Sequence, residues 1–139
     1  MTEAATDGVD PLGIVELVDV CERQAARDEE LFRTLGAWVA DEPDPSRQRW
    51  FATAAHRHAW HAELWRERRP RIPVEAGAGE SSASAGEPDD RGAWYRSQLA
   101  SILDELTALR DRIDATLDPS TCRVIDLVTN DVQAMSDAA

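Results

Sequence analysis

Apolar residues recur at spacings of three and four in four stretches of the chain, which is the period of an α-helix with one buried face. The stretches cover about residues 11–40, 46–69, 92–117 and 120–135. Each contains one mainly apolar stripe. The stripes are Ile14, Leu17, Cys21, Gln24, Asp28, Leu31, Leu35, Trp38; Phe51, Ala54, His58, His61, Trp65; Tyr95, Leu99, Ile102, Leu106, Leu109, Ile113; and Thr121, Ile125, Val128, Val132, Met135. The pattern predicts an all-α domain with four helices.

The breaks between these stretches predict how the helices are connected. Prolines interrupt the pattern at residues 41–45 and 118–120, and such short turns favour antiparallel neighbours. Residues 70–90 are rich in Gly, Ala, Ser and Pro and predict a long linker. The expected fold is a single four-helix bundle over residues 11–139, with two antiparallel helical hairpins joined by a crossover linker.

The start of the chain should be less ordered than the bundle. Residues 1–10 are small and acidic and are expected to be flexible. Asp10 is expected to cap the first helix and Pro11 to occupy its first turn.

Charge and composition narrow the class of protein. The net charge of −12 argues against nucleic acid or an anionic membrane surface as a partner. No apolar run approaches the roughly 20 residues of a membrane span, and no signal peptide is visible, so a cytoplasmic protein is expected. All fifteen basic residues are arginine, which with the many alanines is typical of bacterial genomes rich in G and C. Cys21 and Cys122 lie in apolar patterns and are expected to be buried free thiols.

Polar residues interrupt two of the apolar stripes at matching depths. His58 and His61 lie on the second stripe, and Gln24 and Asp28 lie on the first. Asp28 and His58 are equally far along the chain from Pro43, at the centre of the first turn, so they should meet at one level of the bundle. Burying an imidazole without a partner is costly. The coincidence therefore predicts a buried polar centre.

This centre has several interpretations. One divalent ion, of iron, zinc or manganese, would be held by His58 and His61 together with Asp28 or Glu29. The alternatives are core histidines that are only hydrogen-bonded to these carboxylates or to Gln24, and acid–base catalysis. The further polar residues expected around the centre are Gln24, Glu22, Glu105 and Asp131.

Two other residues of the second stretch are expected outside the core. His56 falls off the buried stripe and is expected at the surface or in an interface. Trp60 shares a different stripe with Leu64, and an exposed Trp at this position would favour a dimer interface or a ligand groove.

The topology and these residues resemble the ferritin-like superfamily, including its small hydroxylase-like members. The pattern of that family has a Glu on helix 1, Glu-x-x-His on helix 2, a Glu on helix 3 and Glu-x-x-His on helix 4, and it holds two metal ions for oxygen chemistry. The counterparts on this chain are, in order, Glu29 or Glu22; His58 and His61; Asp104 or Glu105; and Asp131 and Ala134. His58 stands where the family has a Glu, and Ala134 stands where it has the second His.

The resemblance and its departures together imply a divergent ferritin-like protein without a complete di-iron site. Such a protein would act as a structural, partner-binding or small-ligand-binding protein, with a homodimer or another protein as partner. The alternative is a mononuclear metal-binding protein or a metal-dependent, hydroxylase-like oxidoreductase that uses His58, His61 and a carboxylate. A third interpretation is a complete metal site formed across a dimer. The chain has no Gly-rich phosphate loop, Cys-x-x-Cys pair or nucleophile elbow, so nothing indicates nucleotide binding.

Overall fold

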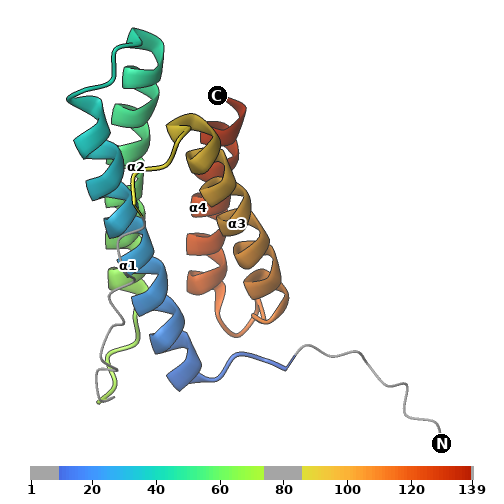
Figure 1. Cartoon of the computed structure of the whole chain (residues 1–139). Coiled ribbons are helices and arrows are strands. Elements are labelled where there is room, and N and C mark those ends of the chain that lie inside the picture. The colour runs from blue at the N-terminus through green and yellow to red at the C-terminus, as the bar shows by residue number, and fades with distance from the viewer. Residues whose placement is uncertain (1–9, 74–85, 139) are drawn as a thin grey trace, which may run out of the picture.

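The computed structural model describes residues 10–73 and 86–138 of the chain. These residues form four helices: α1 (Ile14–Val39), α2 (Pro45–Arg68), α3 (Arg91–Asp111) and α4 (Pro119–Asp137) (Figure 1). Within these two ranges there is no strand, which confirms the all-α prediction. Residues 1–9 of the expected flexible start, and residues 74–85 of the linker expected over 70–90, lie outside the described residues. No helix in the described ranges is long and apolar enough to cross a membrane.

The helices pack in a defined order of neighbours. α1 packs most extensively against α2, α3 packs against α4, and α2 also contacts α4 (Figure 1). Contacts between α1 and α2 join Asp28 to His58 and Glu22 to Arg69, so later residues of α2 meet earlier residues of α1. The two pairs of helices therefore enclose a shared core between them.

The core is built from the stripes that the sequence predicts. Every position of the four stripes is buried, except that Ile14 is 56% exposed at the first residue of α1 and Ile113 is half-buried beyond the end of α3. The largest fully buried side chains are Trp65, Tyr95 and Phe51. Apolar burial on this scale contributes roughly 25 cal/mol per Å² of area removed from water. The predicted free thiols Cys21 and Cys122 are both buried, as expected.

The start of α1 differs from the prediction. Gly13, and not Asp10, is the N-cap residue, and no side chain caps this helix. The preceding segment is held to the end of α3, because Leu12 N–H donates to the Arg112 carbonyl (3.1 Å) and Arg112 Nε donates to the Asp10 carbonyl (2.9 Å). These bonds hold residues 10–12 outside the helix, so the predicted start at Pro11 is wrong.

The end of α3 also differs from the prediction, since the helix stops at Asp111 and not at residue 117. The Asp114 carboxylate accepts hydrogen bonds from the backbone N–H groups of Thr116 (2.8 Å) and Leu117 (3.2 Å). Aspartate side chains compete in this way with helical hydrogen bonds and favour turns. The connection between α3 and α4 is therefore longer than the sequence pattern predicts.

Aspartates cap both helices that follow a short connection. Asp44 accepts from the N–H groups of Ser46 and Arg47 at the start of α2. Asp118 accepts from the Thr121 N–H at the start of α4 and also from Arg68 of α2 (3.0 Å). Burial alone would raise the pKa of Asp118, but the hydrogen bonds from Thr121 and Arg68 hold it below its usual value. This carboxylate thereby fixes the start of α4 against the end of α2.

Two leucines that the sequence pattern assigns to the same helical stretch should differ widely in their contribution to stability, because one is buried and the other is exposed. Leu106→Ala, at a fully buried position of α3, should lower the free energy of unfolding by about 2–5 kcal/mol, because it leaves a cavity in the core. Leu117→Ala, at a position that is 84% exposed, is the matched control and should change it by less than about 0.5 kcal/mol. Urea unfolding followed by circular dichroism measures both values. Equal effects would contradict this packing.

Candidate metal centre

Polar side chains from all four helices meet inside the core at one level. Asp28 of α1 and His58 and His61 of α2 are buried, with side chains at most 2% exposed. Tyr95 of α3 is fully buried beside them and contacts His58. Asp131 of α4 contacts His61 and lies nearer to solvent. Asp28, His58 and His61 thus hold polar groups on stripes that are mainly apolar and face inward.

Asp28, His58 and Tyr95 form a continuous hydrogen-bonded chain. His58 Nδ1 lies 2.8 Å from Asp28 Oδ1, and His58 Nε2 lies 2.7 Å from the Tyr95 hydroxyl. An ionised carboxylate can only accept, so His58 Nδ1–H is the donor to Asp28. His58 Nε2 then accepts from the Tyr95 O–H, and both nitrogens of this ring are satisfied.

His61 is held from one side only. Its Nε2 lies 2.8 Å from Asp131 Oδ2, and the other oxygen of Asp131 accepts from Arg57 at 3.1 Å. Because the carboxylate accepts, Nε2 carries the proton of the neutral ring and Nδ1 presents a lone pair. A carboxylate that fixes the tautomer and orientation of a histidine in this way is the usual outer partner of a metal-binding imidazole.

Two acceptor atoms of the centre are left without a donor. Among the described residues neither His61 Nδ1 nor Asp28 Oδ2 has a hydrogen-bond partner, although both are buried. Leaving a buried polar atom unpaired costs about 1–3 kcal/mol. Asp28, His58 and His61 each offer a ligand atom, and these atoms lie within 4.8 Å of one another. Two lone pairs without a donor at such a point fit a bound cation.

The electrostatics favour a neutral His61. Burial lowers the pKa of His61, and the hydrogen bond to Asp131 and the negative charge of Asp28 offset this only in part. Burial also raises the pKa of the Tyr95 hydroxyl, and the charge of Asp28 raises it further, so this group stays a phenol. His61 is therefore held as a neutral ring, and neutral imidazole is the form that binds metals.

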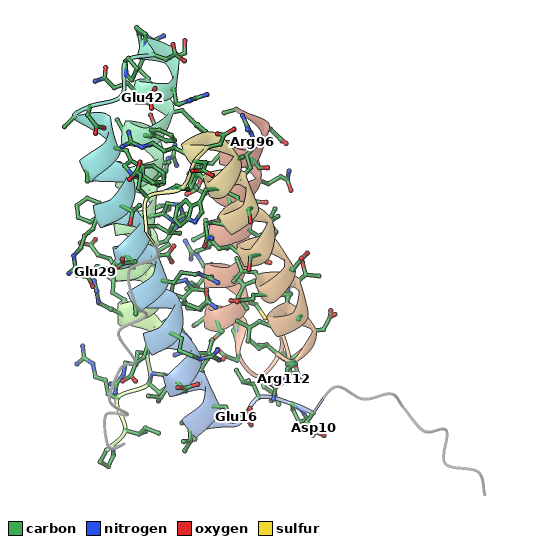
Figure 2. The ribbon with its side chains drawn as sticks, viewed as in Figure 1. Asp10, Glu16, Glu29, Glu42, Arg96 and Arg112 are labelled. Carbon is green, nitrogen blue, oxygen red and sulfur yellow. The ribbon has the colours of Figure 1, made fainter. Side chains whose placement is uncertain are left out.

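The structure separates the remaining candidate residues from this group. Glu29 lies on the outer side of α1, away from α3 and α4, where it pairs with Arg33 and Arg66 (Figure 2). Glu22 pairs with Arg69 at 2.9 Å. Of the two helix 1 carboxylates considered as ligands, the structure therefore brings Asp28 to the histidines and leaves Glu29 at the surface.

Gln24 and Glu105 form a second polar contact nearer to the surface. Gln24 is buried, and its amide donates to Glu105 Oε2 at 3.2 Å. Arg27 binds the same oxygen at 2.5 Å, and half of the Glu105 side chain is exposed. The Glu105 carboxylate is thus already engaged by a cation, outside the histidine group.

The fourth helix contributes a hydrogen-bonding partner in place of a second ligand set. Asp131 binds His61 and Arg57, Ala134 is exposed, and Asp104 of α3 is also exposed. In residues 10–73 and 86–138, one group of three potential ligands has the spacing that a metal requires, namely Asp28, His58 and His61.

Tyr95 is the participant that the sequence analysis missed. The sequence pattern places Tyr95 only within the apolar stripe of α3, yet its hydroxyl contacts both His58 and the Met135 sulfur (3.5 Å). The available signal was a phenol on an otherwise aliphatic stripe, because a buried Tyr usually needs a hydrogen-bond partner.

The chain matches none of the protein-family models, curated proteins or solved structures with which it was compared.

The lowered pKa of His61 predicts a specific dependence of stability on pH. The unfolded chain binds a proton at His61 near pH 6.5, and the folded protein binds it only at lower pH. This contribution to stability is fully present above about pH 6.5 and is lost as the pH falls toward the folded pKa, with a slope of at most about 1.4 kcal/mol per pH unit. In metal-free protein, His61→Gln should reduce the slope of unfolding free energy against pH between about pH 7 and 5.

His56→Gln is the matched control for this prediction, because His56 is an exposed histidine on the same helix. It should leave the slope unchanged. An identical pH profile for the wild-type protein and His61→Gln would contradict the description of His61 as a buried neutral ring.

Proposed function

We propose that the chain is a mononuclear metal-binding protein in which Asp28, His58 and His61 hold one divalent ion of zinc, iron or manganese. The observation that carries this proposal is the pair of buried acceptors, His61 Nδ1 and Asp28 Oδ2, which have no donor among the described residues. A proton on His61 Nδ1 would turn one of these acceptors into a donor, but burial disfavours the charged ring. A metal ion bound by two imidazoles and a carboxylate would satisfy both.

The outer partners support the same arrangement. His61 already has the tautomer that coordination needs, with Asp131 holding Nε2–H. At His58 the metal would replace the proton on Nδ1, and that proton would move to Nε2. The Tyr95 hydroxyl can accept from Nε2–H while it donates to the Met135 sulfur, so His58 keeps a partner in both forms.

Two histidines and one carboxylate leave coordination positions open, which is the requirement for chemistry at a metal. This supports a metal-dependent oxidoreductase or hydroxylase-like activity as the enzymatic form of the proposal. A second candidate function is a structural or partner-binding bundle whose centre is hydrogen-bonded without metal. The bonds from His58 to Asp28 and Tyr95, which are complete in the absence of any ion, favour that candidate.

For the architecture we propose a divergent ferritin-like bundle with two antiparallel hairpins and a long crossover connection. Support comes from the short connections between α1 and α2 and between α3 and α4. It also comes from the pairing of Tyr95 with Met135 and of Arg110 with Asp126, in which later residues of α4 meet earlier residues of α3. Ala134 in place of a ligand supports one ion per chain and not two.

Metal content and affinity test the proposal. Protein purified without a His tag should bind about one zinc ion per chain, measured by elemental analysis and calorimetric titration. Asp28→Asn and His61→Gln should each weaken zinc binding by about 100-fold or more, because each removes a ligand. Asp131→Asn should weaken it by about 10–100-fold, because His61 loses its outer partner. His56→Gln is the control and should bind zinc as the wild-type protein does.

Thermal unfolding separates the two candidate functions. With zinc at about 100 times its dissociation constant, the wild-type protein should gain about 2.7 kcal/mol of stability. No binding of zinc, iron or manganese by well-folded wild-type protein would favour the hydrogen-bonded structural centre. Two ions per chain, bound by residues of that chain, would contradict the single-ion site.

A further inference from the structure

A groove between α2 and α4 lies directly outside the proposed metal centre. Its volume is about 320 Å³, which is at the lower end of the range for small-molecule sites. Asp131 and Met135 form part of its wall, and these are the residues that contact His61 and Tyr95 from outside. A molecule in the groove would therefore be one side chain away from the histidine centre.

The floor of the groove is apolar. Trp50, Ala54, Ala134 and Met135 line it. Trp50 Nε1–H donates to the Met135 carbonyl at 3.1 Å, so the polar atom of the indole is satisfied and its ring is fixed between the two helices. The two alanines leave room where longer side chains would fill the space. A preformed apolar wall of this kind favours a small flat or short aliphatic group, because little ordering is needed on binding.

The rim of the groove is positively charged in a strongly acidic protein. Arg49 and Arg57 line it, although the chain carries a net charge of −12. Arg57 is paired with Asp131, whereas Arg49 makes no ion pair or side-chain hydrogen bond with any described residue. One positive charge of the rim is thus uncompensated, which suits a ligand with a single negative charge. The planar guanidinium group matches the two oxygens of a carboxylate.

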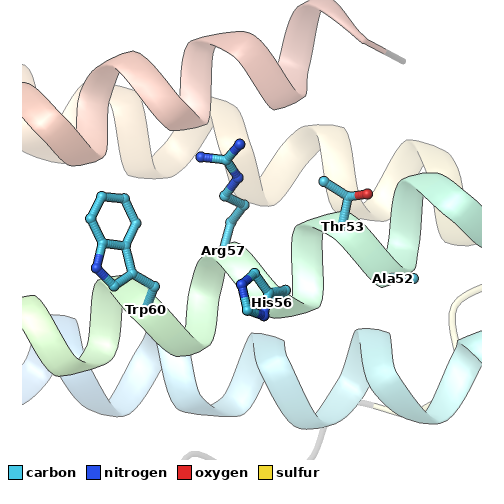
Figure 3. Close-up of a pocket in the computed structure, with 5 residues that line it drawn as sticks. All are labelled: Ala52, Thr53, His56, Arg57 and Trp60. Atoms are coloured by element: carbon cyan, nitrogen blue, oxygen red, sulfur yellow. The ribbon is translucent and has the colours of Figure 1, made fainter.

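A second hollow on the outer face of α2 does not form a comparable site. It is lined by Ala52, Thr53, His56, Arg57 and Trp60, all of which belong to one helix, so it has no opposing wall (Figure 3). Figure 3 shows that the Arg57 side chain points away from this face toward α4. The Arg57 side chain therefore lines the groove as well, while Trp60, which is 38% exposed, lies outside the groove.

We propose that this groove binds a small amphipathic monocarboxylate, with its carboxylate at the arginine rim, on the unpaired Arg49, and its apolar body on Trp50, Ala54, Ala134 and Met135. This chemistry is argued from the groove alone. A second part of the inference rests on the proposed function. If a metal ion is bound, the ligand lies beside it and serves either as a substrate for chemistry at the ion or as a regulator of metal binding.

An NMR titration of metal-free protein with 3-phenylpropionate tests the proposal. The amide signals of Ala134 and Met135 and the indole N–H signal of Trp50 should shift saturably, with a dissociation constant on the order of 0.1–1 mM. The neutral analogue 3-phenylpropan-1-ol and the cation 3-phenylpropylamine should each bind at least about fivefold more weakly, because they lack the charge that the arginines recognise. Inorganic phosphate, which has no apolar body, should shift these signals far less.

Two variants with matched controls locate the ligand. Arg49→Gln should weaken binding of 3-phenylpropionate by about fivefold, whereas Arg123→Gln, an exposed arginine of α4 that does not line the groove, should not. Ala134→Leu should fill the groove and weaken binding by about tenfold or more, whereas Ala100→Leu, at an exposed position of α3, should not. Because the wild-type protein itself is titrated, unfolding of a variant does not decide the outcome.

Four results would overturn the proposal: no saturable shift up to about 10 mM ligand, equal affinity for the alcohol, equal shifts with phosphate, or unchanged binding in both Arg49→Gln and Ala134→Leu. Since these measurements contain no metal, their failure leaves the zinc experiments unaffected. Failure of zinc binding likewise leaves the carboxylate titration valid.

Discussion

The bond between the Asp28 carboxylate and the His58 ring is the contact on which the rest of the centre depends. A buried carboxylate loses its hydration, and the loss is tolerable only if its oxygens find donors or a cation. His58 satisfies one oxygen of Asp28 and is itself fixed by Tyr95, so α1, α2 and α3 are joined at one level of the core. The second oxygen of Asp28 and His61 Nδ1 are both buried without a partner among the described residues. The apolar core packs the helices, and the hydrogen bonds of Asp28 and His58 fix the chemistry of the centre within it.

The sequence predicts the first half of this centre well, for a geometric reason. Asp28 and His58 lie equally far from a short turn, so the helical rise fixes their relative depth, and the structure joins them at 2.8 Å. Successive side chains of an α-helix point about 100° apart around its axis. For this reason Glu29 of α1 lies at the surface while its neighbour Asp28 is buried.

The second half of the centre could be predicted only in part, since the family pattern named Asp131 but nothing singled out Tyr95, and distance from a turn places neither. Tyr95 and Asp131 belong to helices that follow the long segment 70–90, and a connection of that length does not fix the register of α3 and α4 against α2. Their contacts with His58 and His61 depend on tertiary packing. The boundaries that were wrong, at the start of α1 and the end of α3, depend on hydrogen bonds of Arg112 and Asp114 that a periodic pattern does not contain.

NMR measurement of the histidine tautomers tests the central claim most directly, because the claim concerns which nitrogen of each ring carries its proton. In metal-free protein near neutral pH, long-range ¹⁵N–¹H spectra should show His58 protonated on Nδ1 and His61 protonated on Nε2. Addition of zinc should move the proton of His58 to Nε2 and shift the Nδ1 signals of both rings, while the signals of exposed His56 stay unchanged. If His61 carried its proton on Nδ1, or if zinc left the spectra of both buried rings unaltered, the account of Asp28, His58 and His61 as a metal centre would be contradicted.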